Sequence, residues 1–231
     1  IHWEHQPIAL YPDELGFIFS GSAVYDTQNS SEYGTNENPP IIAIYTSHHK
    51  DGLEQQSIAY SNDKGRHFEK SYLNPVIKNP GISDFRDPKA FWNPVRRCWS
   101  LVLAAQDRVF FYASQDMKNW EKTGEFGPEG NHVKGVWECP DLFEIDGQQI
   151  MTCCPQGVDQ KGYDYQNVYQ CGYFPVEFDL KNKSYSFGKF QEFDKGFDIY
   201  ATQTFADEAG RRILIGWMGI PDADYDNDAT V

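Results

Sequence analysis

Short apolar runs separated by polar turns dominate the hydrophobic pattern of this chain. The runs at 41–47, 99–105 and 108–114 are rich in β-branched and aromatic residues and lie between turn-forming residues, as buried strands do. Similar runs lie at 17–24, 56–61, 90–92, 142–145, 149–154, 169–174, 197–205 and 212–218. No segment repeats its apolar residues at the helical period over any length. The pattern therefore predicts an all-β chain.

Small residues interrupt the first run at Ser20, Gly21 and Ser22. A glycine inside a strand often marks the close approach of another backbone, so we expect such an approach here. The next segment, 27–40, is polar and rich in Asn, Ser, Gly and Pro, which predicts a loop. Asp146-Gly147 stands between two runs and is a strong signal for a hairpin turn.

A short polar motif recurs along the chain. Residues 61–70 and 114–122 both read Ser-x-Asp, a short turn, an aromatic residue and then Glu-Lys, and residues 2–5 resemble the end of a third copy. The aromatic positions 3, 68 and 120 are 65 and 52 residues apart, and each interval holds several strand-like runs. Chance similarity between polar hairpins is the alternative. Intervals of this length can each hold about four short strands, which favours the interpretation that they are blades of a β-propeller.

Length, composition and net charge limit the domain organisation and the classes of binding partner that this chain can have. The 231 residues suffice for one large domain or two small ones. Aromatic residues make up 16 %, which suits either flat sugar-binding surfaces or an all-β core. The net charge of −14 argues against nucleic acid and anionic membranes as partners. No apolar run approaches the length of a membrane span, and no signal peptide opens the sequence.

The cysteines indicate the compartment. Their number, five, is odd, and they form neither a C-x-x-C pair nor a zinc-binding spacing; they are Cys98, Cys139, Cys153, Cys154 and Cys171. We therefore expect reduced thiols in a cytoplasmic protein. The alternating aspartates of 222–228 lack the glycine and the final glutamate of a calcium loop, so we predict neither a metal site nor a cofactor.

One candidate catalytic carboxylate is Glu138. It lies between Trp137 and Cys139, and Pro140 follows. Proline disfavours the helical region for the residue before it, so we expect an extended segment here. Aromatic and apolar neighbours would desolvate Glu138 and raise its pKa, as a general acid near neutral pH requires. The alternative is an ordinary half-exposed strand glutamate beside a core tryptophan.

A second candidate is Asp87, which lies between Arg86 and Pro88. A neighbouring guanidinium would keep this carboxylate ionised, and a turn at the proline would fix its direction. One protonated and one ionised carboxyl group is the division of labour that glycosidases use.

Several motifs together resemble glycoside hydrolase family 32, the family of invertases, sucrose-6-phosphate hydrolases and other β-fructosidases. They follow one another in the family's order over nearly the whole chain, and the Arg-Asp-Pro and Glu-Cys-Pro motifs are specific as a pair. The matching segments are His2-Trp3-Glu4-His5, Phe19-Ser20-Gly21-Ser22, Phe85-Arg86-Asp87-Pro88, Trp137-Glu138-Cys139-Pro140, Tyr200 to Phe205 and Gly216-Trp217-Met218.

The resemblance implies a five-bladed β-propeller and a retaining, two-step hydrolysis through a fructosyl-enzyme intermediate. It implies that Glu138 is the acid/base and that Asp87 stabilises the transition state by binding fructosyl hydroxyl groups. It also implies substrate-binding roles for a further set of residues: Arg86, Phe19, Ser20, Tyr200 and Trp217.

One departure from the family pattern concerns the nucleophile. The family carries it as the aspartate of an Asn-Asp-Pro-Asn motif upstream of the His-Trp-Glu-His motif, and this motif is absent from residues 1–231. The resemblance implies that the start of the first blade, part of the last blade and the C-terminal β-sandwich also lie outside residues 1–231. We therefore expect residues 1–231 to form a partial propeller domain that is inactive on its own. Thr202, where the family often has proline, should loosen its turn.

Two alternatives to a hydrolase of sucrose, sucrose 6-phosphate or short fructans remain open. A fructosyltransferase would use the same residues with a sugar as the acceptor, and a non-catalytic propeller would only bind sugar. The sequence predicts a small carbohydrate as the partner but does not predict an oligomeric state.

Overall fold

The computed structural model describes residues 2–127, 133–179, 184–196 and 199–219. The chain divides into two compact units, Ile1–Phe126 and Gly127–Val231, called the first and the second unit below. No helix occurs in the described ranges, and hence none that is long and apolar enough to span a membrane. The predicted all-β class is therefore confirmed for the part of the chain that the structure describes.

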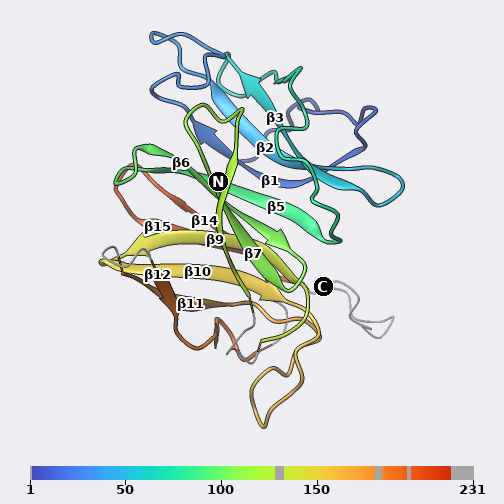
Figure 1. The fold of residues 1–231 in the computed structure, drawn as a ribbon, viewed down its shortest axis with the longest axis vertical. Coiled ribbons are helices and arrows are strands. Elements are labelled where there is room, and N and C mark those ends of the chain that lie inside the picture. The colour runs from blue at the N-terminus through green and yellow to red at the C-terminus, as the bar shows by residue number, and fades with distance from the viewer. Residues whose placement is uncertain (1, 128–132, 180–183, 197–198, 220–231) are drawn as a thin grey trace. The chain divides into compact units, whose positions relative to one another are not determined.

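The first unit contains two antiparallel sheets of four strands, each ordered as in the sequence (Figure 1). The first sheet consists of β1 (Phe17–Tyr25), β2 (Ile41–His48), β3 (Glu54–Ser61) and β4 (Glu69–Lys70). The second consists of β5 (Phe85–Asn93), β6 (Cys98–Ala105), β7 (Arg108–Ser114) and β8 (Glu121–Phe126). Both sheets supply one apolar core, which includes Ile42, Ile44 and Ile58 from the first sheet and Leu101 and Leu103 from the second.

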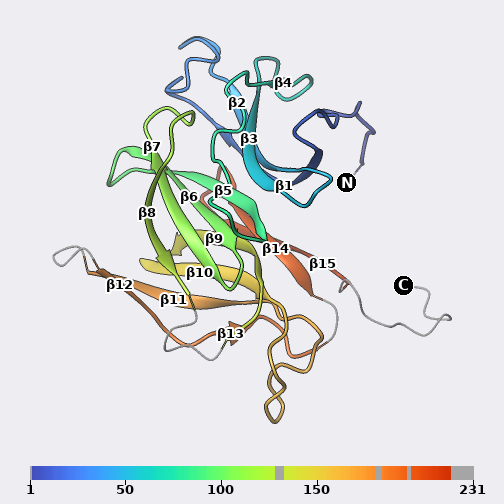
Figure 2. The same ribbon diagram turned by 45° about the vertical axis from the view of Figure 1, so that its right-hand side comes forward.

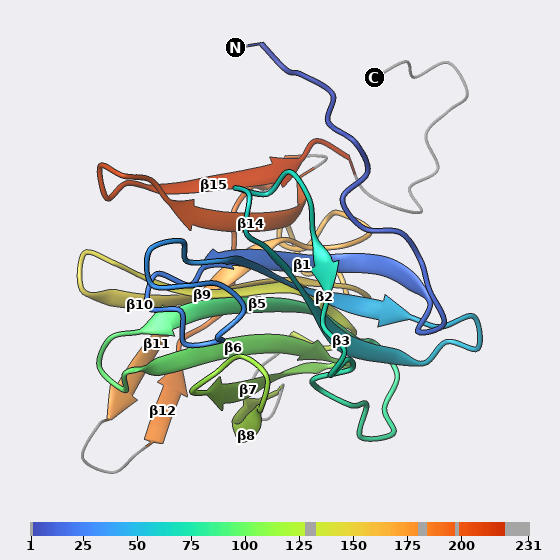
Figure 3. The same cartoon turned by 90° about the horizontal axis from the view of Figure 1, so that it is seen from above.

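The second unit contains a sheet with the same up-and-down order (Figure 2). It consists of β9 (Trp137–Ile145), β10 (Gln148–Pro155), β11 (Gly172–Asp179), β12 (Ser184–Phe187) and β13 (Gln191–Glu192). Because β12 and β13 both pair with β11, they act as one interrupted fourth strand. A hairpin of β14 (Tyr200–Ala206) and β15 (Arg212–Trp217) follows, and β14 packs against β9 and β10 (Figure 3).

The repeated Ser-x-Asp motif forms the same turn in both sheets of the first unit. Ser61 donates to Asp63 (2.8 Å), which accepts the His67 N–H (2.9 Å); Ser114 donates to Asp116 (3.1 Å), which accepts the Asn119 N–H (2.8 Å). Each turn joins the third strand of its sheet to the fourth. The two internal copies are confirmed as equivalent elements of four-stranded sheets.

The proposed third copy, residues 2–5, is different. It lies outside every strand, and Trp3 is 93 % exposed. Because this segment pairs with no strand of the described residues, nothing here supports its assignment to a third sheet.

Seven predicted runs match a strand to within two residues at both ends: 17–24, 41–47, 56–61, 99–105, 108–114, 149–154 and 212–218. The runs 90–92 and 142–145 cover only the later part of longer strands, since β5 begins at Phe85 and β9 at Trp137. The strands within the runs 169–174 and 197–205 begin later than predicted, at Gly172 and Tyr200. The polar outer strands β4, β8, β12 and β13 were not predicted. Asp146 and Gly147 have φ values of 50° and 78°, as a tight hairpin turn requires. The close approach at Gly21 is confirmed, since a Cβ atom there would lie 2.1 Å from the Ile44 carbonyl oxygen.

Candidate active site

A β-bulge lies near the start of the first strand of each sheet and of the hairpin. In all four cases two residues of that strand stand opposite one residue of its neighbour. The bulged pairs are Phe19-Ser20 in β1, Asp87-Pro88 in β5, Cys139-Pro140 in β9 and Ala201-Thr202 in β14. Every residue predicted for the site except Trp217 therefore lies in a bulge or directly before one. Bulges re-aim side chains and are frequent beside active sites.

The backbone is left-handed at three of these bulges, and at Cys139 this contradicts the sequence prediction. We expected Cys139 to be extended because a proline follows, but its φ is 50°, and Asp87, also before a proline, has a φ of 63°. Ala201 adopts the same left-handed conformation with a φ of 52°. A non-glycine residue held in this region costs on the order of 1–3 kcal/mol and persists only where its surroundings fix it. The extra residue of the bulge thus overrides the local preference for an extended backbone.

Asp87 is held from both sides within the first unit. It is 8 % exposed, and its N–H donates to the Thr46 hydroxyl (3.1 Å), which in turn donates to Gln56 (2.8 Å). The hydroxyl of Ser22 donates to the Pro88 carbonyl (2.9 Å). The predicted turn at Pro88 is therefore a strand bulge clamped by side chains of β1 and β2.

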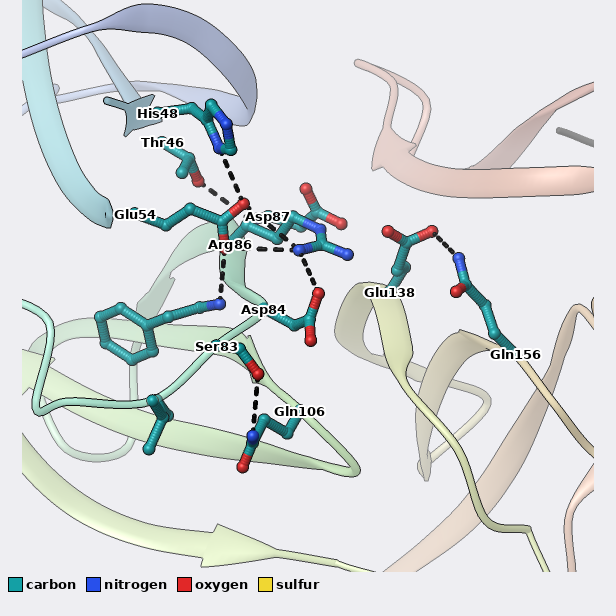
Figure 4. Close-up of polar contacts among 12 residues, drawn as sticks. Thr46, His48, Glu54, Ser83, Asp84, Arg86, Asp87, Gln106, Glu138 and Gln156 are labelled. Carbon is teal, nitrogen blue, oxygen red and sulfur yellow. Dashed lines mark hydrogen bonds and ion pairs between the residues drawn. The ribbon is translucent and has the colours of Figure 1, made fainter. Parts of the chain in front are cut away.

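The Arg86 guanidinium is paired with two carboxylates of its own unit. Its Nη1 lies 2.7 Å from Asp84 Oδ1 and 3.2 and 3.3 Å from the two oxygens of Glu54 (Figure 4). The expectation that Arg86 keeps Asp87 ionised stays a prediction.

Phe19 and Ser20 are both exposed on the bulge of β1. The Phe19 ring stacks on the imidazole of His48, with centroids 4.1 Å apart and planes 5° apart. An aromatic face that is supported on one side and 41 % exposed is suited to contact the apolar face of a sugar ring.

Glu138 lies in a hydrogen-bonded triangle within the second unit. Its Oε2 accepts from the Tyr200 hydroxyl (2.6 Å) and from the Gln156 amide (2.8 Å), and that amide also donates to the Tyr200 oxygen (3.1 Å). Figure 4 shows the Gln156 amide pointing at the Glu138 carboxylate. Burial, and then the Glu138 carboxylate, raise the pKa of Tyr200 far above its ordinary value, so the hydroxyl stays protonated as a donor. Glu138 is therefore fixed in direction by two donors.

The environment of Glu138 differs from the expectation in one respect. We expected the neighbouring indole to desolvate the carboxylate, but Trp137 is fully buried and stacks on Phe174 with centroids 5.4 Å apart. Successive residues of a strand face opposite sides of the sheet, so Trp137 is directed away from the carboxylate face. The carboxylate instead accepts hydrogen bonds at Oε2 from Tyr200 and Gln156.

Trp217 lies directly opposite Tyr200 in the β14–β15 register and is 53 % exposed. This pairing brings two of the predicted sugar-binding residues together on one hairpin. Sequence reasoning missed His48, Glu54 and Gln156, because no local motif marks them. Apart from the contact between His48 and Glu54, the contacts that connect them to the predicted site residues join distant parts of the sequence.

All five cysteines are thiols in the structure. Cys154 and Cys171 lie with their sulfur atoms 3.2 Å apart, and Cys171 Sγ lies 3.1 Å from the Thr202 hydroxyl. Burial raises the pKa of Cys154, whereas the hydrogen bond from Cys154 lowers that of Cys171. Thr202 is fully buried, and its hydroxyl makes a contact that proline could not make. The expected loosening of this turn stays a prediction.

Within the described ranges, no group of three or more His, Cys, Asp or Glu side chains is placed to hold a metal ion. The acidic segment 222–228 lies outside those ranges.

Comparison with known proteins identifies the same family that the motifs suggest. The model of the glycosyl hydrolases family 32 N-terminal domain matches residues 1–230. A levanase of Bacillus subtilis is 44 % identical over 232 residues, covering 94 % of this chain and 33 % of the relative. A sucrose-6-phosphate hydrolase of Staphylococcus xylosus is 38 % identical over 229 residues, covering 94 % of this chain and 43 % of the relative.

Solved structures show the same similarity. A Bombyx mori GH32 β-fructofuranosidase variant in complex with sucrose superposes with a TM-score of 0.81 at 37 % identity, covering 97 % of this chain and 47 % of that one. A Schwanniomyces occidentalis fructofuranosidase complexed with fructose has a TM-score of 0.81 at 27 % identity, covering 95 % and 44 %. The chain thus spans about a third to a half of the length of these relatives.

Proposed function

The chain belongs to glycosyl hydrolase family 32, and from this premise we propose that the protein containing it hydrolyses terminal β-D-fructosyl bonds with retention of configuration. The relatives named as levanase and sucrose-6-phosphate hydrolase support this proposal, as do the structural neighbours that hold sucrose or fructose. Sucrose, sucrose 6-phosphate and short fructans are the candidate substrates. The cytoplasmic location stays a prediction from the thiols.

We infer that the sheets belong to a five-bladed β-propeller, with residues 1–231 supplying part of that domain. The repeated order of four antiparallel strand positions and the equivalent bulge at the start of each sheet support this inference. The hairpin β14–β15, which forms a separate two-stranded sheet, would be part of a further blade.

The hydrogen-bonded triangle around Glu138 is the observation that carries the proposal. A general acid must present its proton along one fixed direction, and Tyr200 and Gln156 hold this carboxyl group in place. In the first step Glu138 donates a proton to the glycosidic oxygen while the bond to the fructosyl carbon breaks and the nucleophile binds that carbon. In the second step the Glu138 carboxylate takes a proton from water, whose oxygen attacks the carbon and releases the nucleophile.

Asp87 is assigned to stabilise the fructosyl group as it gains oxocarbenium character. Asp87 is buried and its backbone is hydrogen-bonded, so its carboxyl group is held in place before the reaction. Hydrogen bonds from sugar hydroxyl groups to this carboxyl group can then strengthen in the transition state. Arg86, Phe19, Ser20, Tyr200 and Trp217 are assigned to substrate binding. The nucleophile would come from the Asn-Asp-Pro-Asn motif that the family resemblance places outside these residues.

The test uses the protein expressed from its full native reading frame, with sucrose and levan oligosaccharides as substrates. We expect Glu138→Gln to abolish hydrolysis while sucrose binding, measured by calorimetry, is retained. We expect Asp87→Asn to lower kcat by several orders of magnitude with a modest loss of affinity. Hydrolysis that persists in Glu138→Gln would refute the acid/base assignment, and an effect of Asp87→Asn on affinity alone would make Asp87 a binding residue only.

Product analysis separates the alternatives. Free fructose as the main product supports a hydrolase, whereas fructosylated oligosaccharides would identify a transferase. Binding without turnover by the full-length protein would favour a non-catalytic sugar-binding propeller.

A further inference from the structure

We propose that Glu54 is a positioning residue of the fructosyl site, holding Arg86, the backbone that leads into the Asp87 bulge, and the support of Phe19. The inference rests on the proposed function, because it concerns how the substrate-binding residues of the first unit are kept in place. Glu54 itself is not assigned a contact with substrate.

Glu54 is a buried carboxylate in an otherwise neutral stretch of β3. The residue is 3 % exposed, and it is followed on the strand by the uncharged residues 55–61. Burial of an ionised carboxylate is costly unless it is paired and hydrogen-bonded. The groups that pair with the Glu54 carboxylate therefore indicate its role.

The first two partners lie on β5, directly before the Asp87 bulge. Glu54 Oε2 accepts the Phe85 N–H at 2.7 Å, and both carboxylate oxygens lie within 3.3 Å of Arg86 Nη1. Gln56, two residues further along β3, donates to the Phe85 carbonyl at 2.8 Å. The start of β5 is thus hydrogen-bonded to β3 through the Glu54 carboxylate and the Gln56 amide. The Glu54 carboxylate also pairs with the Arg86 guanidinium.

The third partner connects Glu54 to Phe19. His48 Nδ1 lies 3.2 Å from Glu54 Oε1, and since a carboxylate only accepts hydrogen bonds, Nδ1 carries the proton. The His48 ring is the surface on which the exposed Phe19 ring stacks. Figure 4 shows Glu54 between His48 and Arg86, with Asp84 at the same guanidinium nitrogen that Glu54 contacts.

One buried carboxylate therefore joins elements that carry three of the predicted site residues. Glu54 contacts Arg86 directly and binds the backbone N–H of Phe85, two residues before Asp87. It is connected to Phe19 through His48, on which the Phe19 ring stacks. If any of these groups shifts by about 1 Å, the loss in rate can reach about 100-fold, so a residue that restrains all three has a large effect without touching the substrate.

The test variant is Glu54→Gln, in the protein expressed from its full native reading frame. Glutamine keeps one oxygen that can accept the Phe85 N–H but puts an amide NH2 where Arg86 and His48 need an acceptor. We expect kcat/KM for sucrose to fall about 10- to 100-fold, mainly through a rise in KM. The dissociation constant of free fructose, measured by calorimetry, should rise with it.

Asp26→Asn is the matched control. Asp26 is also fully buried in the first unit, but within the described part of the chain its carboxylate accepts only from Ser30 and Ser31, in the loop that follows β1. This control makes the same acid-to-amide change at a site that only supports the fold. It should lower the melting temperature and leave KM and the fructose dissociation constant unchanged.

The split between KM and kcat separates positioning from folding. A purely structural role for Glu54 would reduce the fraction of active protein, which lowers apparent kcat but leaves KM and fructose affinity as they were; that result overturns the proposal. If Glu54→Gln does not fold, His48→Ala removes only the branch to Phe19, and an unchanged fructose affinity in that variant would overturn the proposal as well. A parent protein that binds fructose but hydrolyses nothing refutes the proposed hydrolase function while the fructose measurement still decides the role of Glu54.

Discussion

Replacing Tyr200 by phenylalanine is the most direct test of how Glu138 is held. The change removes one hydroxyl group and little volume, and that hydroxyl donates to Glu138 Oε2 at 2.6 Å. Tyr200 is 3 % exposed, so bulk water has little access to replace the lost donor. Because burial and the adjacent carboxylate raise the pKa of Tyr200, the hydroxyl is present as a donor throughout the working pH range.

The size of the effect follows from the charge on the acceptor. A hydrogen bond to a charged group contributes about 1.5–3 kcal/mol, and one pH unit corresponds to about 1.4 kcal/mol. The Tyr200 hydroxyl stabilises the carboxylate form of Glu138, so its removal favours the protonated, acidic form. Because the Gln156 donor remains at 2.8 Å, we expect the lower end of this range, a shift of about one pH unit. The alkaline limb of the kcat/KM profile, where the acid form is lost, should therefore move to higher pH.

The assay is kcat/KM for sucrose against pH in the full-length protein. Tyr173→Phe is the control, because it removes a hydroxyl in the same unit that donates to Gln191 at 3.0 Å. An alkaline limb that stays in place, or that moves to lower pH, would refute the assignment of Tyr200 as a donor to Glu138, the proposed catalytic acid. A shift in the Tyr173 variant as well would show that the effect is not specific to the triangle.

Two further substitutions test the fold that supports the site. Gly21→Ala should destabilise the first unit by about 1–3 kcal/mol, because the new Cβ would lie 2.1 Å from the Ile44 carbonyl oxygen; an unchanged midpoint of urea unfolding would contradict this close approach. Asp116→Asn should lower stability at pH 7. Burial raises the pKa of Asp116, but hydrogen bonds from Asn119, Lys118 and Ser114 lower it below 3.8 overall, so the carboxylate stabilises the fold above that pH. The difference in unfolding free energy between this variant and the parent should shrink as the pH falls below 3.8, and a constant difference would argue against a role for the charge.

The central strands could be predicted from the sequence because their own side chains show the apolar pattern of buried strands. Runs such as 41–47 and 99–105 are apolar and β-branched or aromatic, and they are buried as expected. The turn motifs are equally local, since Asp63 and Asp116 each bond to backbone groups three or four residues further on. The short outer strands, such as β4 and β13, are polar and exist through pairing with a neighbour, so their own residues carry no signal.

The support of the site could not be predicted, because it depends on contacts between distant segments. Glu54 lies 32 residues from Arg86, and Tyr200 lies 62 residues from Glu138. Nothing in the residues around Glu54 or Gln156 distinguishes them from ordinary polar strand residues. The conformation of Cys139 was predicted wrongly for a related reason: the preference before a proline is a local effect, whereas the bulge is imposed by pairing with β10.

The bulges explain how one repeated element can carry different chemistry. Arg86, Glu138 and Tyr200 occupy the same position, the residue directly before the bulged pair, in β5, β9 and β14. In each case the first bulged residue has a φ between 50° and 63°. Since the position and its backbone are the same, the role of each residue is decided by its side chain and by its partners: two carboxylates for the guanidinium, two donors for Glu138, and an acceptor for the Tyr200 hydroxyl. The left-handed backbone at each bulge costs local conformational energy, and in return it fixes the direction of the neighbouring side chain. Substitutions at the bulged residues should therefore lower activity while the strands themselves still form.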